Sequence, residues 1–345
     1  MSETAGGKAA VPFVHAETMD WLLEASDPGP RYLALRDVVG LPSDDPDLVA
    51  ARRAAHRSGP IAEILQAMHA DGFWIAPGPG YSPKYRSTVW SVLSLAQLGA
   101  RVEEDGRIAA AGAHVLDHAL TPYGQFSASG TPGSTADCLQ GNLCRALLEL
   151  GCEDPRLGAA LDWMARATTG EGVAARGDTT TPIRYYAGKC GPGFRCGSND
   201  GLPCAWGATK VMLAFGRLPS SARSPEVEAA VDVGVEFLVG RDPTTAPYPS
   251  GYSSKPTGNW WKFGFPVFYV TDLLQIAEAM VALGRGDEPR LTPLRDLIRA
   301  KADERGRWPL EYGYGGKTWF DAGTKKAPNK WVTIRALRVL GHQGG

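Results

Sequence analysis

The chain has 345 residues, of which 43% are hydrophobic and 21% charged, and its formal net charge is −1. This composition is ordinary for a globular protein, and its charge balance gives no general attraction to nucleic acid or to an anionic membrane. The longest apolar stretches, such as residues 267–274, are far too short to span a bilayer. The N-terminal sequence lacks a charged region followed by an apolar one, so we see no signal peptide and expect a cytoplasmic protein. Thiols stay reduced there, which makes the six cysteines thiols or metal ligands rather than a disulfide framework.

Hydrophobic spacing of the helical type recurs along the whole chain, between loops rich in its 42 glycines and 26 prolines. Glycine and proline gather at residues 77–83, 131–134, 188–203 and 245–264. In chain order, the spacing predicts helices over residues 17–25, 30–39, 46–56, 61–70, 85–98, 107–120, 136–150, 155–167, 205–215, 225–239, 266–283, 291–302 and 330–340.

These helices follow a repeated unit. A first helix leads to a Gly-x-aromatic turn at residues 72–74, 124–126 and 306–308, and a more apolar second helix follows and ends at a glycine. Pairs of this kind bury their faces only by stacking on neighbouring pairs. We therefore predict an all-α protein, a single α/α toroid of about five to six helix pairs with long loops over one end. Its second helices would line the inside, and residues 1–14 would form a flexible tail. A linear repeat is the alternative.

Four segments carry a resemblance to a known group of proteins: GPGYSPKYRSTVW, DCLQGNLC, GNWWKFGFPVFYVTDLLQ and KWVTIRALRVL. Together with the Gly-x-aromatic turns, they resemble the terpenoid cyclase and protein prenyltransferase superfamily. They are most similar to uncharacterised bacterial prenyltransferase or squalene-oxidase repeat proteins. The resemblance runs from about residue 61 to 340 and implies the toroid fold. The chain departs from this superfamily in three respects: it lacks the DxDD motif, the DDxxD motif and the zinc-ligand spacing of the prenyltransferases.

The cysteines suggest zinc as a cofactor. Cys190, Cys196 and Cys204 lie in a long loop over residues 184–206, and Cys138 lies on the helix before it. Four thiolates are a common tetrahedral zinc set, and three with a water make a catalytic one. We predict Cys190, Cys196 and Cys204 as ligands, with Cys138 or Cys144 as the fourth. The alternative is that they are small buried side chains.

Two aspartates are the candidate acid–base residues. Asp137 lies in the first turn of a predicted inner helix, where burial would raise its pKa; the alternative is a helix cap. Asp272 lies within an apolar stretch, where an unpaired carboxylate is costly. It is therefore either paired with a cation such as Lys262 or Arg86, or catalytic, and we include Tyr269 and Lys262 in the catalytic set.

Aromatic and cationic side chains form the predicted substrate-binding set. Six aromatic residues within positions 260–269 would form a wall for an apolar or cationic ligand, with core packing as the alternative. Cations at the start of helix 85–98 would bind a carboxylate or phosphate, with a solvated charge cluster as the alternative. The complete set is Tyr85, Arg86, Trp90, Gln140, Asn142, Arg184, Tyr186, Lys189, Trp206, Trp260, Trp261 and Phe265.

These patterns favour an enzyme with a central cavity lined by aromatic residues and cysteines. It would act by acid–base chemistry on a small apolar or anionic molecule, and the resemblance suggests an isoprenoid-type cyclase or transferase. The alternatives are a zinc-assisted hydrolase or lyase and a toroid that binds a ligand without catalysis. We expect a small-molecule substrate and no nucleic acid or membrane partner, since no nucleic-acid, Walker, GxGxxG or GxSxG motif is present.

Overall fold

The computed structural model describes residues 14–171, 190–249 and 253–341, and these ranges are all-helical, with thirteen α-helices and no strand. No helix within them is long and apolar enough to cross a membrane. The predicted N-terminal tail lies, except for Val14, outside the described residues. The helices are α1 (Ala16–Leu22), α2 (Pro28–Ala34, continued by a π-helical turn, Leu35–Val39), α3 (Pro46–Arg57), α4 (Pro60–Gln66), α5 (Thr88–Gln97), α6 (Gly106–His118), α7 (Asp137–Leu150), α8 (Arg156–Thr169), α9 (Ala205–Phe215), α10 (Pro225–Val239), α11 (Leu273–Ala282), α12 (Thr292–Ala300) and α13 (Lys330–Leu340).

Every predicted helix is present, and α9, α10 and α13 begin and end at the predicted residues. The largest error is the start of α11, predicted at residue 266 and found at Leu273. Pro266 is a frequent first helical residue, which is why the pattern predicted a start there. The chain instead stays non-helical until Asp272, whose side chain accepts a hydrogen bond from the Gln275 backbone N–H and caps the helix.

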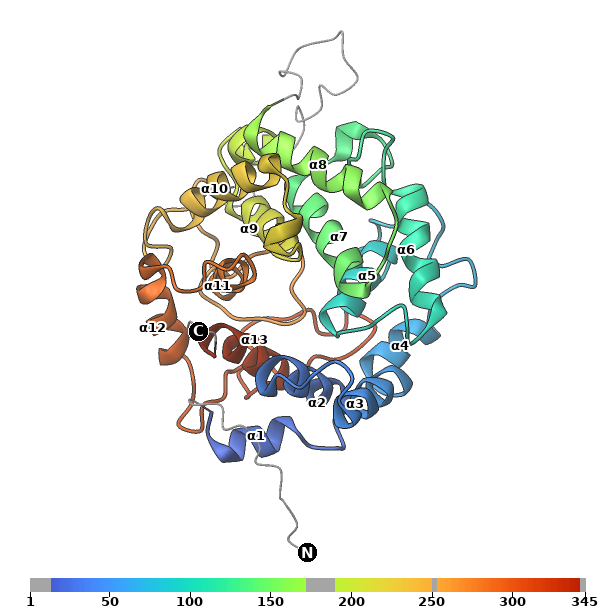
Figure 1. The fold of residues 1–345 in the computed structure, drawn as a ribbon, viewed down its shortest axis with the longest axis vertical. Helices are drawn as coiled ribbons and strands as arrows, with labels where there is room; N and C mark the ends of the chain where they lie inside the picture. Colours follow the sequence, from blue (N-terminus) through green and yellow to red (C-terminus); the bar gives the residue numbers. More distant parts are fainter. Residues whose placement is uncertain (1–13, 172–189, 250–252, 342–345) are drawn as a thin grey trace, which may run out of the picture.

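The helices that lie toward the centre of the molecule are α2, α5, α7, α9, α11 and α13, and the others lie at its periphery (Figure 1). Contacts join the central helices in the order α5, α7, α9, α11, α13 and α2. The peripheral helices α6, α8, α10 and α12 each pack against central ones. All eleven residues of α9 are buried, whereas only Leu294 and Ile298 are buried in α12. The apolar second helices of the sequence pattern are therefore the central ones.

The Gly-x-aromatic turns fasten one helix pair to the next. Gly72, Gly124 and Gly306 all have positive φ, at 84°, 87° and 75°. A Cβ on Gly72 would lie 2.5 Å from the Ala110 carbonyl oxygen of α6, and one on Gly124 would lie 2.5 Å from the Ala159 carbonyl oxygen of α8. At Gly72 and Gly124, glycine is thus required both for its backbone conformation and for close approach to the next peripheral helix.

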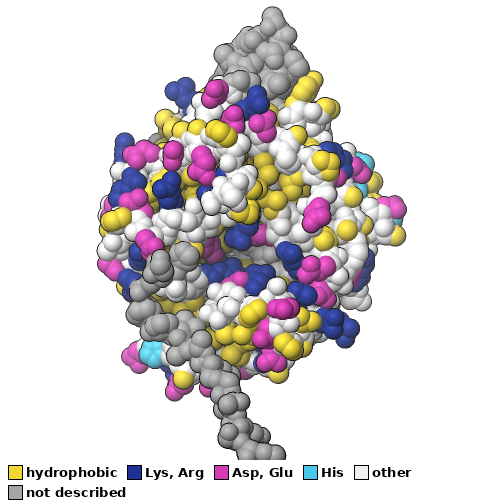
Figure 2. Space-filling view, in the orientation of Figure 1, with side chains coloured by type: hydrophobic (Ala, Val, Ile, Leu, Met, Phe, Trp, Pro, Cys, Tyr) yellow, Lys and Arg dark blue, Asp and Glu magenta, His cyan; other side chains and the backbone are white. Residues whose placement is uncertain are grey.

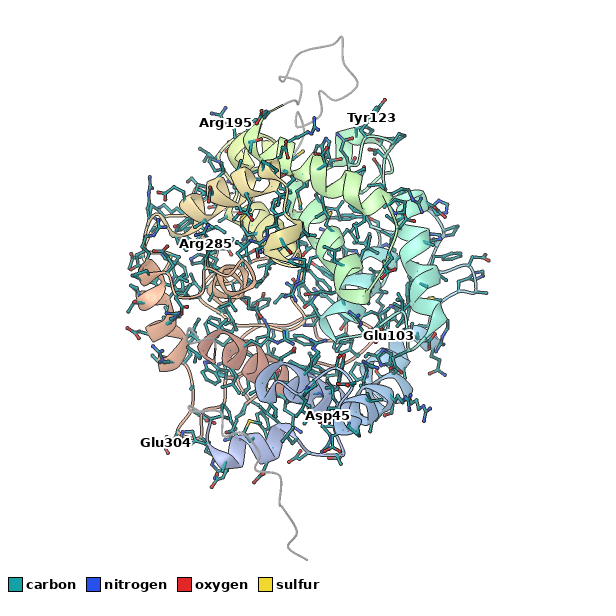
Figure 3. All side chains as sticks on the ribbon, viewed as in Figure 1. Asp45, Glu103, Tyr123, Arg195, Arg285 and Glu304 are labelled. Atoms are coloured by element: carbon teal, nitrogen blue, oxygen red, sulfur yellow. The ribbon has the colours of Figure 1, made fainter. Side chains whose placement is uncertain are left out.

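The aromatic residue of each turn points back into its own pair. The indole N–H of Trp74 donates to the Ile64 carbonyl at 2.7 Å, and that of Trp308 donates to the Ile298 carbonyl at 2.7 Å. The backbone N–H groups of the two tryptophans donate to threonine hydroxyls on the following central helices. In the turn before α7, Tyr123 points outward at the edge of the molecule (Figure 3), whereas Phe126 is buried.

Two glycines let α7 and α9 approach closely at the position of the candidate site. A Cβ on Gly141 would lie 2.3 Å from the Lys210 carbonyl carbon and 2.5 Å from the Val211 nitrogen. A Cβ on Gly207 would lie 2.8 Å from the Cβ of Asp137. The first turns of the two helices are consequently in direct contact, which brings Asp137 against α9.

Candidate functional site

An aromatic wall forms where the central helices begin. The hydroxyls of Tyr85 and Tyr269 lie 3.1 Å apart, and the ring of Tyr269 lies 5.7 Å from that of Trp206 and 6.0 Å from that of Trp90. Phe268, which was not predicted, lies 5.3 Å from both Tyr85 and Trp90. Four predicted residues from α5, α9 and the segments before α5 and α11 are therefore brought together. We call Tyr85, Trp90, Trp206, Phe268 and Tyr269 the aromatic wall.

A lysine already lies across one edge of this wall. The ammonium nitrogen of Lys84 is 4.5 Å from the ring centre of Tyr269, 5.3 Å from that of Tyr81 and 5.9 Å from that of Trp90. Aromatic faces attract cations at such distances. Lys84 is exposed while Tyr85 and Tyr269 are half-buried, so this edge of the wall is open to solvent.

Asp137 is a buried acid beside the wall. Its side chain is buried in the first turn of α7, and its Oδ2 has no hydrogen-bond partner within the described residues. Burial raises the pKa of this carboxyl well above its ordinary value, and the nearby Cys204 raises it further. Both effects favour the protonated form of the Asp137 carboxyl. A carboxyl that keeps its proton can donate it.

Two thiols, those of Cys138 and Cys204, interact with Asp137, and a third, that of Cys196, interacts with Cys204. A hydrogen bond with Cys204, together with burial, raises the pKa of Cys196. Burial, Cys204 and Asp137 raise the pKa of Cys138 to about 12. Cys138 and Cys196 therefore hold their protons at neutral pH, and a protonated thiol is a poor nucleophile and a poor metal ligand.

The predicted four-cysteine zinc set is not assembled in the structure. Cys190 packs with Trp163 and Ala167 in a small cluster separate from the main core, to which Cys204 belongs. In the described ranges, no group of three or more His, Cys, Asp or Glu side chains is arranged to hold a metal ion. The spacing of the cysteines did not reveal that Cys190 packs against Trp163 and Ala167 of α8.

Lys210 is a functional candidate that the pattern reading missed. It is fully buried in the middle of α9, and its ammonium nitrogen donates to the Gln275 side-chain oxygen. Burial lowers the pKa of Lys210 to about 7; Asp272 opposes this shift, and Arg145 and Arg335 add to it. The signal was available, because Lys210 is the one charged residue in the apolar run 205–215.

Asp272 is paired rather than free. Its carboxylate caps α11 through the Gln275 N–H at 2.9 Å and contacts both terminal nitrogens of Arg335 at 3.3 Å. The Tyr312 hydroxyl donates to it at 3.4 Å. Arg335 also binds Glu278 at 2.7 Å. A fully buried carboxylate with this many partners is a structural centre that holds α11 to α13.

The cation that pairs with Asp272 is therefore Arg335, and the predicted partners were wrong. Lys262 is exposed. Arg86 lies over the ring of Trp319 at 5.2 Å and donates to backbone carbonyls of the 316–318 loop. Arg335 escaped the prediction because it follows Asp272 by 63 residues and only the fold brings them together.

Gln140 serves the repeat rather than a ligand. Its amide nitrogen donates to the Gly124 and Ala160 carbonyls at 2.9 and 3.0 Å, and its oxygen accepts the Phe126 backbone N–H at 2.6 Å. At the other two turns, threonine hydroxyls accept the equivalent backbone N–H, that of Trp74 or Trp308. With both ends of the amide hydrogen-bonded, Gln140 anchors the turn.

The tryptophans at 260 and 261 are also anchors. Trp260 is fully buried and its indole N–H donates to the Pro243 carbonyl at 2.9 Å. Trp261 is 36% exposed and donates to the Thr244 carbonyl at 3.0 Å. Both hold the loop after α10, so they stand outside the aromatic wall, and the core-packing alternative applies to Trp260.

The remaining predicted residues are divided in the same way. Phe265 stacks on Trp331 at 4.9 Å, at the start of α13. Asn142 is buried and donates to the Phe268 carbonyl at 3.3 Å, so it supports the wall from α7. Three predicted residues lie outside the described residues: Arg184, Tyr186 and Lys189.

No protein-family model matches the chain, and no curated protein matches it either. Among solved structures, a crystal structure of a protein from Actinoplanes is similar over 85% of this chain and 98% of that chain, with 12% sequence identity and a TM-score of 0.31. A TM-score of this size supports no inference about fold or function. The assignment of function therefore rests on the chain's own residues.

Proposed function

We propose that the helices form an α/α toroid of the terpenoid cyclase and prenyltransferase kind. The ordered contacts of α5, α7, α9, α11, α13 and α2 support a closed ring. Further support comes from Gly99, just after α5, where a Cβ would lie 2.7 Å from side-chain atoms of both Tyr32 and Leu33 in α2. The aromatic wall would then lie where the central helices begin, at one mouth of the ring.

We infer that the protein is an enzyme that protonates an apolar molecule at this mouth, as an isoprenoid-type cyclase does. The observation that carries the proposal is the Oδ2 of Asp137, buried without a partner in the described part of the chain, next to the turn that bears Trp206. Leaving a buried polar atom unpaired costs stability. Such a cost is commonly found where a group is kept available for a substrate.

The proposed chemistry needs no cofactor or second reactant. Asp137 transfers its proton to a carbon–carbon double bond, and the resulting cation is stabilised by the π faces of Trp206 and Tyr269. Ring closure and loss of a proton then give a product with the same atoms as the substrate. Lys210, whose pKa is about 7, accepts the released proton, and exchange with solvent restores both groups.

The test is conversion of a panel of linear polyprenes and allylic diphosphates, with products identified by gas chromatography and mass spectrometry. We expect a product of the same mass as one of the linear polyprenes. Asp137→Asn should lower its rate at least about 100-fold, the usual scale of general-acid catalysis. The matched control is Asp162→Asn, which changes a half-exposed aspartate paired with Arg166 on α8. The proposal fails if no member of the panel is converted, or if Asp137→Asn and Asp162→Asn are equally active.

A further inference from the structure

A second candidate site lies at the other ends of the central helices. A cavity of about 520 Å³ is formed by the last turns of α5, α7, α9, α11 and α13 and by the π-helical turn after α2. Figure 2 shows Lys and Arg side chains gathered around the hollow at the middle of the visible face. Since the aromatic wall stands where the same helices begin, this cavity is distinct from the proposed catalytic site.

The charged side chains that line the cavity are mostly arginines. Five arginines face three carboxylates, an excess of two positive charges. The charged lining residues are Arg36, Arg101, Arg145, Arg217, Arg338, Asp37, Glu149 and Glu278. A cavity of this size is large enough for a small molecule.

Two of the carboxylates are each shared by two arginines. Glu149 contacts Arg145 at 2.9 Å and Arg217 at 3.1 Å. Each guanidinium has five N–H donors, and a single carboxylate saturates only part of the two forks. Donors are therefore left for another acceptor in the cavity.

The second shared carboxylate is Asp37. Its oxygens accept hydrogen bonds from Arg36, at 2.6 Å, and from Arg338. The Nε of Arg338 is buried and has no partner within the described residues. A buried donor without a partner is costly, and an anion in the cavity is the kind of group that satisfies it.

The arginines also repel one another across the cavity. Glu149 favours the charged form of Arg217, but burial and the nearby Arg145, Arg338 and Arg36 lower its pKa overall. The guanidinium groups are therefore close enough to interact unfavourably. A bound anion would relieve that repulsion.

The simplest alternative is that the arginines only offset the negative ends of the helices, which favour cations. Within the described ranges, Arg101 is the one lining arginine that donates to a backbone carbonyl at a helix end, that of Glu149 at 3.0 Å. The other four direct their contacts to side chains around the cavity. Compensation of the helix ends therefore does not account for them.

We propose that this cavity binds a small anion carrying two or more phosphate or carboxylate groups. Arginine forks match both groups through paired hydrogen bonds. Two probes distinguish the kinds of anion: inorganic pyrophosphate represents phosphates, and citrate represents carboxylates. Calorimetric titration of the full chain at low ionic strength measures each affinity, because salt would screen the partly exposed arginines.

We expect at least one probe to bind with a dissociation constant below about 1 mM. Arg217→Gln should weaken binding about tenfold or more, since a charge-assisted hydrogen bond is lost. Glu149→Gln should tighten it, because it removes a competing carboxylate from the same arginines. The matched control is Arg285→Gln: this arginine is half-exposed, pairs with Asp232 on α10 and does not line the cavity.

The proposal is overturned if neither probe binds at 10 mM, on the order of ten times the expected limit. It is also overturned if Arg217→Gln binds as tightly as Arg285→Gln. The thermal unfolding of each variant, measured alongside, shows that the fold is intact; Arg338→Gln replaces Arg217→Gln if the latter is unfolded. The assay does not involve Asp137 or the aromatic wall, so its result is independent of the proposed catalytic activity.

Discussion

Replacing Lys210 by methionine tests the buried polar centre of the molecule through its pH dependence. Burial lowers the pKa of Lys210 from 10.5 in a model amine to about 7 in the folded protein. The unfolded chain therefore holds one more proton than the folded chain between these two values. Stability must then rise with pH across that window and be lowest below pH 7. The full difference of about 3.5 pKa units corresponds to about 5 kcal/mol, as an order of magnitude.

This effect can be measured between pH 7 and 8.5, where the Lys210 contribution to the free energy of unfolding changes by about 2 kcal/mol. Above that range the buried thiols interfere. Burial raises the pKa of Cys138 from 9.0 to about 12, so near pH 9 the unfolded chain loses thiol protons that the folded chain keeps, and stability falls. Comparing wild type with Lys210→Met at each pH removes this contribution, because both chains have the same cysteines.

The assay is urea unfolding, followed by far-UV circular dichroism, in steps from pH 6.5 to 8.5. We expect the free energy of unfolding of wild type to gain about 2 kcal/mol relative to Lys210→Met over this range. Lys325→Met, which changes an exposed lysine, should follow the wild-type curve. Equal pH slopes for wild type and Lys210→Met would refute the argument that burial controls this group.

Three further substitutions test other parts of the structure. Asp137→Asn should raise the free energy of unfolding at pH 7. The pKa of Asp137 is higher in the folded chain than in the unfolded chain, so ionisation of this carboxyl favours unfolding, and asparagine removes that effect. In the same urea assay the gain should vanish near pH 3, where the carboxyl is protonated in both states. Gly141→Ala should lower stability by about 1–3 kcal/mol or more, since the new methyl meets backbone atoms. Gly158→Ala, on the exposed side of α8 with open space around it, should be neutral or slightly stabilising, and an equal melting temperature for the two alanine variants would contradict the close helix contact. Arg335→Met should cost about 3–5 kcal/mol by leaving Asp272 buried without its cation, and a loss below about 1 kcal/mol would show that the pair is not structural.

The helices could be predicted from the sequence because each depends on local signals. α9, α10 and α13 have apolar spacing that ends at a glycine, and α10 also has a proline after its N-cap serine. The start of α11 could not be predicted in this way. Its cap is Asp272, and the carboxylate is held there by Arg335 on another helix. A tertiary contact, rather than Pro266, decides where that helix begins.

The candidate site likewise contains residues that local signals indicate and residues whose role depends on tertiary contacts. Tyr85 and Asp137 could be named from the sequence because each lies close to the predicted start of a central helix, and Tyr269 could be named because it belongs to the aromatic run 260–269. The anchoring contacts of Gln140 could not be predicted, because its partners, the turn at 124–126 and α8, become its neighbours only after the pairs stack. Lys210 was not predicted, because a single lysine in an apolar helix is also compatible with a position at the surface, where its charge reaches water.

The central claim is that Asp137 is a neutral carboxylic acid at pH 7, held ready to give up its proton. The most direct measurement is the infrared spectrum of the wild-type protein at pH 7, with the spectrum of Asp137→Asn subtracted. The account predicts a carbonyl band of a protonated carboxyl group in the difference spectrum. A difference spectrum that contains only carboxylate bands would mean that Asp137 is ionised, and the acid proposed for the reaction would not exist.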